Sequence, residues 1–293
     1  MLIKPWLRLV RPRFLLASVI AVLAGIAISW SSLNPYTAAL TMLGVVLLHA
    51  SVDMLNDYWD FKRGIDTKTK RTPASGGTGV LPEGILKPKD VRTVGLGLLV
   101  AGALVGGYFV IISGPVIAIL LGFAIISIYF YSTRIVDSGL AEVFVAIKGS
   151  MIVIGTVFIQ QGMITTSAVH VGATLGILSA LVLFVASFPD YNADKSGGRR
   201  TLVIVFGRAR AAKLYWLFLF ASHIALFCGV WSESLYPWSL ACFITLPLAV
   251  YAGYGLAKYH SSDNVGKVLQ NTILYSRITG IMLVGTLFAF AVI

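Results

Sequence analysis

Charged residues are scarce in this chain. Only 12% of its 293 residues are Asp, Glu, Lys or Arg, 57% are hydrophobic, and the mean hydropathy is +0.86. Soluble domains carry about twice this share of charged residues, so the composition excludes an ordinary soluble protein. Cysteine is also rare. Cys228 and Cys242 lie in apolar runs without the spacing of a metal or redox motif, and we interpret them as packing residues.

Acidic residues are outnumbered by basic ones, 12 against 23, which gives a net charge of +11. Such a surplus can serve nucleic acid binding, but it also arises when the loops of a membrane protein lie over anionic lipid. Because the apolar content is so high, we predict the lipid bilayer as partner and no nucleic acid. No small-residue cleavage site follows the first apolar run, so we interpret this run as a membrane helix and not as a signal peptide.

Long apolar runs dominate the rest of the sequence. A helix needs roughly 20 residues to cross the hydrocarbon core of a membrane, and only helices or closed barrels satisfy their backbone groups there. We therefore predict an all-α, polytopic helical bundle, a single membrane-embedded domain over 1–293. The nine expected spans are 14–31, 36–55, 92–112, 115–132, 140–160, 167–188, 212–231, 236–256 and 272–292.

The distribution of Lys and Arg predicts the orientation of this bundle, since these residues gather in cytoplasmic connections. The four alternate connections near 31–35, 113–114, 161–166 and 232–236 contain no Lys or Arg. The basic residues lie instead in the N-terminal segment or at the other connections, such as 62–92, 195–213 and 258–277, with Lys148 as the exception. We expect a cytoplasmic N-terminus and an external C-terminus in the cell membrane.

An acidic cluster follows the second span. His49, Asp53, Asn56, Asp57 and Asp60 are separated by three or four residues or sums of these, so they share one face of a helix. Ionisable residues at membrane depth are costly and usually mark a functional site. We expect this stripe to face the bundle interior or a cavity on the inner side.

A second acidic cluster follows the sixth span, where Asp190 and Asp194 are four residues apart. Like charges at this spacing repel each other, which suggests a cation between them. The two clusters resemble each other in composition. One follows the second span and the other follows the sixth, so they are four helices apart. We therefore predict two four-helix repeats, at about 14–132 and 140–256, followed by one last helix at about 272–292.

Two acidic helix ends facing one cavity suit Mg²⁺, which prefers oxygen ligands and commonly bridges carboxylates and substrate phosphates. The predicted ligands are Asn56, Asp57, Asp60, Asp66, Asp190 and Asp194. A diphosphate held there would be neutralised and assisted as a leaving group. Basic residues near the clusters could bind it further, in particular Arg71, Lys68 and Arg199. The other candidates are Lys62, Arg63, Lys70, Lys195 and Arg200.

Three residues nearer the membrane interior are candidates for catalysis. Asp53 lies one turn deeper than the first cluster and could act as general base on an acceptor hydroxyl. Lys148, about two turns into the fifth span, could bind diphosphate or an acceptor carboxylate, or it could extend to the interface. Tyr131 is one of several aromatic residues that could stabilise an allylic cation. His49 could contact substrate or be an interior histidine.

These motifs resemble the UbiA superfamily of intramembrane prenyltransferases. The resemblance rests on the nine-helix plan, on Asn56-Asp57-x-x-Asp60 after the second span and on Asp190-x-x-x-Asp194 after the sixth. It covers essentially the whole chain. The segments 62–67, 75–80, 11–13 and 200–202 are similar to the 1,4-dihydroxy-2-naphthoate polyprenyltransferase branch.

This resemblance implies Mg²⁺-dependent transfer of a polyprenyl group from polyprenyl diphosphate to the naphthoate ring, with loss of its carboxylate, as in menaquinone biosynthesis. The chain departs from the commoner first motif of the superfamily, because Gly64 stands where a third acidic residue would fall and Asp66 comes two residues later. Asp66 is therefore a less certain ligand than Asp60.

Other functions remain open at the level of sequence. Within the superfamily the acceptor could be a hydroxybenzoate, a chlorophyllide, haem or a prenylated glycerol phosphate. Secondary transporters also combine repeats with intramembrane charges, but their sites lie near the midplane, whereas the acidic residues here lie at helix ends. A CDP-alcohol phosphotransferase would need a denser Asp-Gly and Ala-Arg pattern, which is absent.

Overall fold

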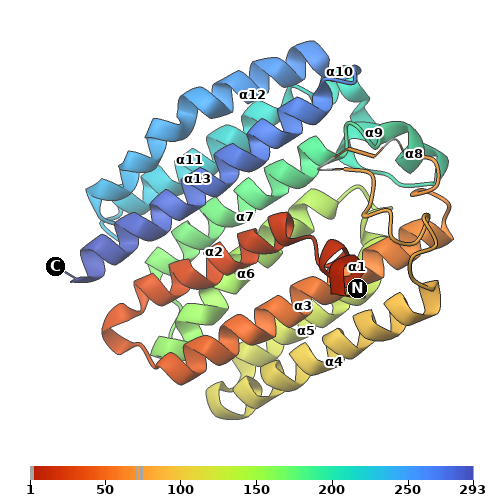
Figure 1. Cartoon of the computed structure of the whole chain (residues 1–293). Helices are drawn as coiled ribbons and strands as arrows, with labels where there is room; N and C mark the ends of the chain where they lie inside the picture. Colours follow the sequence, from red (N-terminus) through yellow and green to blue (C-terminus); the bar gives the residue numbers. More distant parts are fainter. Residues whose placement is uncertain (1–2, 70, 73–74, 293) are drawn as a thin grey trace.

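The computed structural model describes residues 3–69, 71–72 and 75–292, which form helices and their connections and no β-strand. The long helices lie side by side in one bundle (Figure 1). They are α2 (Pro12–Ile28), α3 (Pro35–Lys62), α4 (Pro88–Ser113), α5 (Pro115–Phe130), α6 (Ala141–Gln161), α7 (Thr166–Ala186), α11 (Leu214–Trp231), α12 (Leu246–Tyr259) and α13 (Val265–Val292). Shorter elements connect them: α1 (Ile3–Leu9), α8 (Tyr191–Ser196), α9 (Leu202–Phe206), α10 (Arg208–Ala211), the 3₁₀ segments Trp30–Ser32 and Pro237–Thr245, and a π turn, Tyr131–Ile135.

The predicted membrane spans are confirmed as helices. Eight helices in the described part of the chain are long and apolar enough to cross a membrane, and α1 with α2 make a ninth if this pair, bent by 62°, counts as one span. The helices α2, α3, α4 and α5 each begin with proline, which fits a first helical position because that N–H would have no partner within the helix. The protein is a multi-span, all-α membrane protein.

Helix α3 is longer than the predicted second span. It continues to Lys62 and is 28 residues long, so the whole first acidic cluster lies on one uninterrupted helix. The second cluster differs. Helix α7 ends at Ala186, and Asp190 precedes the separate short helix α8, whose Asp194 N–H donates to the Asp190 carbonyl at 2.9 Å. The break includes Pro189, a residue that disfavours helical angles in the one before it.

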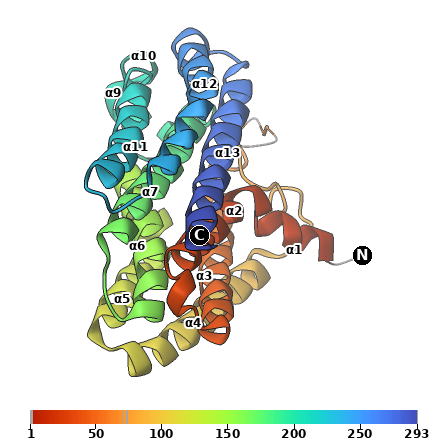
Figure 2. The same cartoon turned by 90° about the vertical axis from the view of Figure 1, so that its left-hand side faces the viewer.

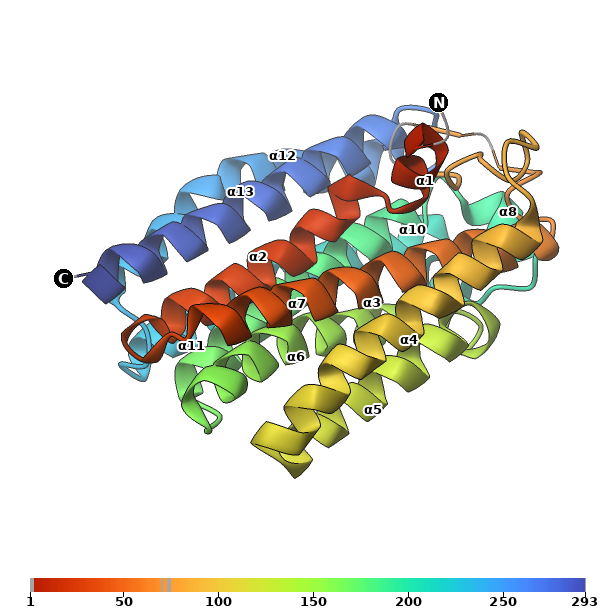
Figure 3. The ribbon, with the colours of Figure 1, turned by 60° about the horizontal axis from the view of Figure 1, so that its bottom comes forward.

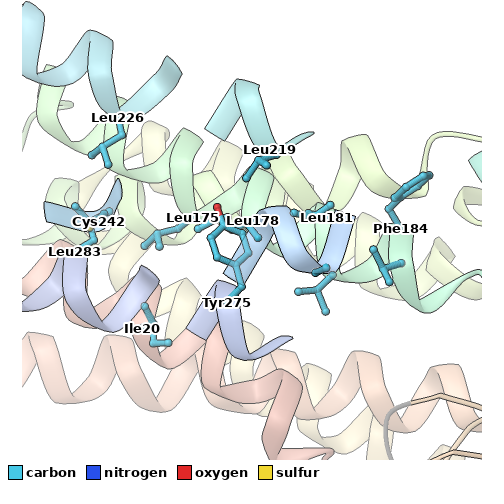
Figure 4. Close-up of a cluster of buried hydrophobic side chains, with 14 of the residues drawn as sticks. Ile20, Leu175, Leu178, Leu181, Phe184, Leu219, Leu226, Cys242, Tyr275 and Leu283 are labelled. Carbon is cyan, nitrogen blue, oxygen red and sulfur yellow. The ribbon is translucent and has the colours of Figure 1, made fainter. Parts of the chain in front are cut away.

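Small residues allow the central helices to approach closely, as is common in membrane bundles. At the crossing of α6 and α7, a Cβ atom on Gly149 would come within 2.7 Å of the Gly176 Cα. A large apolar core extends from this crossing over α2, α11, α12 and α13. Figure 4 shows part of it, with Tyr275 of α13 beside Leu175 and Leu178 of α7. Many large apolar side chains on the outside, such as Phe220, are exposed, as expected for a surface in contact with lipid.

The acidic clusters lie at one end of the bundle. Helix α8 and the described parts of the connection between α3 and α4 (63–69, 71–72 and 75–87) gather there together with α1, at the end opposite to the C-terminus (Figures 1 and 3). A second, small apolar cluster fixes this connection: Val80 and Leu81 pack with Leu9 of α1, Met54 of α3 and Val91 of α4. Helix α2 lies between α3 and α13 and packs against both (Figure 2).

One sequence-based expectation about charge was wrong. Arg277 was expected at an inner connection, but α13 begins at Val265, and Arg277 is a buried residue within the helix, only 8% exposed. The two four-helix repeats and the cytoplasmic N-terminus stay predictions.

Candidate active site

The bundle encloses a cavity of about 220 Å³ that contains residues of both acidic clusters. We call one part of it the acidic end, formed by Asn56, Asp60, Asp66, Asp190, Asp194 and Arg199, and the other part the basic end, formed by Ser18, His49, Asp53, Lys148 and Arg277. Helix α3 contributes to both parts, because His49 and Asp53 precede Asn56 and Asp60 by one to three turns. The cavity therefore extends along α3 from the end of the helix toward the membrane interior.

Arg199 joins the two acidic clusters at the acidic end. Its guanidinium pairs with Asp60 of α3 and, at 2.8 Å, with Asp194 of α8. The amide of Asn56 donates to Asp60 at 2.9 Å and accepts from the Ser132 hydroxyl in the π turn at 3.0 Å. Asp60 and Asp194 are almost fully buried, with 4% and 3% of their surfaces exposed. Two segments more than 130 residues apart in sequence are thus held at one point, as the sequence predicted.

Two further carboxyl groups at the acidic end, those of Asp66 and Asp190, form no direct ion pair with Arg199. Asp66 Oδ2 and Asp190 Oδ1 are buried and have no hydrogen-bond partner in the described structure. Burial raises the pKa of Asp66 to about 7, and the nearby Asp60 and Asp57 carboxylates add to this effect. Burial and the Asp194 carboxylate raise the pKa of Asp190 to about 8. Buried carboxyl groups of this kind are stabilised in the charged form only by a cation or by additional donors.

A glycine-rich loop covers these two carboxyl groups. The backbone N–H of Gly76 donates to Asp190 Oδ2 at 3.3 Å. Gly77 has a left-handed φ of +69°, and a Cβ atom there would lie 2.6 Å from both oxygens of Asp66. Glycine is therefore required at 77 both for the backbone angle and for the close approach to Asp66.

The residues of the acidic end fit a divalent cation that is held jointly with a substrate. Within the described residues, no three His, Cys, Asp or Glu side chains form a ready metal cluster, and Arg199 already occupies Asp60 and Asp194. Asp66 and Asp190 nevertheless present carboxylate oxygens without partners. Mg²⁺ typically takes one or two carboxylates and completes its shell with phosphate oxygens and water, so an incomplete protein site is what this chemistry requires.

Asp57, a predicted metal ligand, lies outside the cavity lining. It is 1% exposed, and its carboxylate pairs with Arg11 and accepts a hydrogen bond from the Thr78 hydroxyl. Arg11 stands at the bend between α1 and α2 with a positive φ of 45°. Asp57 therefore ties the N-terminal helices and the glycine-rich loop to α3, and its predicted role at the metal stays a prediction.

Two predicted diphosphate ligands also lie outside the lining. Arg71 pairs with Glu83, which is bound by Arg8 as well, at 3.1 Å. Lys68 is exposed. Lys70 lies outside the residues that the structure describes. Of the predicted cations near the diphosphate, Arg199 alone is among the cavity residues in the described chain, and the other roles stay predictions.

The predicted catalytic residues all line the cavity. Asp53 Oδ2 lies 3.7 Å from His49 Nε2, and His49 Nδ1 lies 2.6 Å from the hydroxyl of Ser18 on α2. Lys148 reaches the cavity from α6 and is within electrostatic range of Asp53. Tyr131 begins the π turn, a local distortion that is frequent at functional sites.

Arg277 is a cavity residue that the sequence reading missed. Its guanidinium donates to the Arg13 carbonyl at 3.3 Å from Nε and at 3.2 Å from Nη2. The signal was present in the sequence, because an ionisable residue at membrane depth usually faces a functional cavity. It was overlooked because the inner connection was extended to 277, into the predicted last span 272–292, so Arg277 was counted as a loop residue although it lies within α13.

A polytopic helical bundle with carboxylates, amides and cations around one intramembrane cavity defines a class of membrane proteins that handle charged substrates within the bilayer. The chain belongs to the UbiA prenyltransferase family, whose model matches residues 18–276. The resemblance predicted from the two acidic motifs is thereby confirmed.

One relative and two solved structures are similar to nearly the whole chain, and the two structures share its fold. A 1,4-dihydroxy-2-naphthoate octaprenyltransferase of Bacillus subtilis (strain 168) is 26% identical over 282 residues, which cover 94% of this chain and 89% of the relative. The apo structure of a UbiA homologue from Aeropyrum pernix K1 has a TM-score of 0.72 at 13% identity, covering 95% and 98% of the two chains. A UbiA homologue from Archaeoglobus fulgidus, solved with GPP and Mg²⁺, has a TM-score of 0.65 at 14% identity, covering 97% and 99%.

Proposed function

We propose that this protein transfers a polyprenyl group from a polyprenyl diphosphate to 1,4-dihydroxy-2-naphthoate within the membrane, as a step of menaquinone biosynthesis. The observation that carries this proposal is that both acidic motifs meet through Arg199 in one intramembrane cavity. The names of the relatives support the choice of acceptor.

The diphosphate binds at the acidic end. Asp66 and Asp190 would hold Mg²⁺ through their free carboxylate oxygens, and Asn56, Asp60 and Asp194 would be further ligands once Arg199 binds phosphate oxygens instead. Mg²⁺, when bound, neutralises the diphosphate and assists its departure. Arg199 supports the same charge from the protein side, since a guanidinium binds phosphate oxygens through two parallel N–H groups.

The reaction is an electrophilic substitution on the acceptor ring. The bond between prenyl C1 and oxygen breaks, and its electron pair leaves on the diphosphate. The ring π electrons then form the new carbon–carbon bond with the allylic cation. The ring carboxylate departs as CO₂, and the electron pair of its bond to the ring restores aromaticity, so atoms and charge balance without an added reactant.

Residues on the inner side of the acidic end assist this step. Asp53 accepts a hydrogen bond or proton from a ring hydroxyl, which makes the ring more nucleophilic. Tyr131 offers its aromatic face to the allylic cation, and Lys148 contacts the acceptor. We further propose that the enzyme lies in the cell membrane with the acidic end toward the cytoplasm, where the soluble naphthoate is available.

A reconstituted assay tests the function. The purified protein in lipid nanodiscs, given a polyprenyl diphosphate, 1,4-dihydroxy-2-naphthoate and Mg²⁺, is expected to form a prenylated, decarboxylated naphthoquinol that is detected by mass spectrometry. Chelation of the metal should stop the reaction, and added Mg²⁺ should restore it. Hydroxybenzoate, chlorophyllide, haem and prenylated glycerol phosphate serve as competing acceptors. Product with one of these and none with the naphthoate would refute the proposed acceptor. Release of diphosphate without prenylation of any of the acceptors would refute prenyl transfer.

A further inference from the structure

Two cations at the basic end, Lys148 and Arg277, form no direct ion pair with a carboxylate of the described residues. Within the described residues, Arg11 and Arg199, the other two cations of the cavity lining, each lie within 4 Å of an acidic oxygen. Neither Lys148 nor Arg277 forms such an ion pair in that part of the chain. Two charges facing the interior of a membrane protein are costly unless a partner neutralises them, so an anion from outside the chain is the expected partner.

Arg277 is prepared for such a ligand. It is 8% exposed and lines the cavity. Its hydrogen bonds go to neutral acceptors, two to the Arg13 carbonyl and one, at 3.5 Å, to the Ser276 hydroxyl. A guanidinium has five N–H groups, so two remain for a ligand in the cavity. The bonds to Arg13 fix the plane of the guanidinium, which lowers the entropy cost of binding a planar anion.

The charge balance at the basic end fits one carboxylate. Lys148 and Arg277 supply two positive charges, and Asp53 supplies one negative charge near Lys148. Both cations lie within electrostatic range of His49, so they converge on the same region although they come from α6 and α13. One uncompensated positive charge matches a singly charged ligand better than a diphosphate, whose larger charge is matched by Arg199 and a metal ion at the acidic end.

Hydrogen-bonding groups for a hydroxyl lie next to these cations. Asp53 Oδ2 is buried without a hydrogen-bond partner in the described structure, and it lies 3.7 Å from His49 Nε2. His49 is held from its other side by Ser18 at 2.6 Å. A ligand hydroxyl could donate to Asp53 in this position. The basic end thus offers an acceptor for O–H beside two donors for a carboxylate.

We propose that Arg277 determines acceptor specificity: together with Lys148 it forms a carboxylate clamp at the basic end, which binds the carboxylate of the acceptor and leaves a ring hydroxyl facing Asp53. This inference rests on the proposed function for the identity of the site, and it adds Arg277 as the residue that makes the cavity prefer an acid to its neutral analogue. The clamp holds the acceptor by its own anion, independently of the metal and diphosphate.

Equilibrium binding without catalysis tests the clamp. The protein in nanodiscs, without Mg²⁺ or prenyl donor, is titrated with 1-hydroxy-2-naphthoate and with 1-naphthol, which lacks the carboxylate. We expect the wild-type protein to bind the acid at least about tenfold more tightly, as for a carboxylate bound by charged donors. Arg277→Gln and Lys148→Gln should each remove most of this preference, and Arg277→Lys should keep part of it.

Two controls separate the clamp from the proposed reaction. Asp60→Asn, at the acidic end, should bind the hydroxynaphthoate as tightly as the wild type while it loses prenyl transfer. Binding of Mg²⁺ with inorganic diphosphate should be unchanged in Arg277→Gln, which also shows that this variant is folded. If transfer is absent but the acid preference depends on both cations, the proposed function fails and the clamp stands. If both glutamine variants keep the preference of the wild type, or if Arg277→Gln loses diphosphate binding instead, the clamp is refuted.

Discussion

The two ends of the cavity carry opposite imbalances of charge. The acidic end has four carboxyl groups and the guanidinium of Arg199, which pairs directly with two of them. The basic end has two cations and the carboxyl group of Asp53. Both ends include residues of α3, only a few turns apart. A metal-bound diphosphate would neutralise the charge of the acidic end, and an anionic acceptor would neutralise that of the basic end. The two ligands can therefore lie close together in one cavity with little mutual repulsion.

The largest effect is expected from removing a carboxylate of the acidic end. Asp60→Ala or Asp194→Ala should reduce prenyl transfer on the order of 10³-fold, because each removes a partner of Arg199 and a proposed ligand for the metal. Turnover in nanodiscs measures this loss. Asp90→Asn, an exposed carboxylate in the first turn of α4, is the matched control and should behave as wild type. Full activity in both alanine variants would remove the metal assignment.

Arg199→Gln tests whether the acidic end is held together by its one cation. Loss of one partner from a buried ion pair costs about 3–5 kcal/mol, so thermal stability should fall, and transfer should drop about 100-fold. Added Mg²⁺ should raise the unfolding temperature more in this variant than in the wild type, because it replaces the missing charge. Arg63→Gln is the control: Arg63 pairs with Asp137 outside the cavity lining, so Mg²⁺ should give it no extra stabilisation. Equal stabilisation of the two variants would contradict this account.

The raised pKa values of the acidic end predict how metal binding depends on pH. The pKa of Asp66 is about 7 and that of Asp190 about 8, so without metal both carboxyl groups take up protons as the pH falls through these values. A metal ion must displace these protons. Its apparent affinity should therefore decrease as the pH is lowered from about 8.5 to 6, by up to about tenfold per pH unit for each group. Asp190→Asn should abolish the part of this dependence near pH 8, and an unchanged profile in that variant would show that Asp190 does not bind the metal.

The smallest expected effect distinguishes the close approach of Gly77 to Asp66 from the strain of a positive φ. Gly77→Ala and Gly84→Ala both place a side chain at a similar positive φ, +69° and +68°, which costs about 1–2 kcal/mol of stability in each. A Cβ at 77 would also displace the carboxylate of Asp66, whereas nothing lies within 4 Å of a Cβ at 84. We expect Gly77→Ala to weaken Mg²⁺-dependent transfer several-fold and Gly84→Ala to leave it unchanged. The same loss in both variants would trace the effect to the backbone alone.

Periodicity was sufficient to place part of the site. The spacing of His49, Asp53, Asn56 and Asp60 predicted one helical face, and all four line the cavity on the uninterrupted helix α3. Asp57 follows Asn56 by about 100° around the helix, and it faces Arg11 instead. Sequence spacing fixes direction within a helix, but it does not reveal which neighbouring element each direction meets.

Residues in connections could not be placed in the same way. The positions of Asp66, Lys68 and Arg71 depend on a loop whose path is set by Gly64 and Gly76, both at positive φ, and by packing of Val80 against distant helices. No local pattern encodes such contacts. Arg277 was missed for a simpler reason, because it was counted with the basic residues of the connection 258–277 although the predicted span already began at 272.

The carboxylate clamp has a consequence for the direction of turnover. The proposed reaction removes the ring carboxylate as CO₂, so the prenylated quinol no longer carries the group that Lys148 and Arg277 bind. The naphthoate should therefore bind the cavity more tightly than the quinol, because only the naphthoate carries the carboxylate. Quinol that accumulates in the membrane should inhibit the enzyme only weakly. Arg277, which has no carboxylate partner among the described residues, would in this way favour release of the isoprenoid quinol into the bilayer.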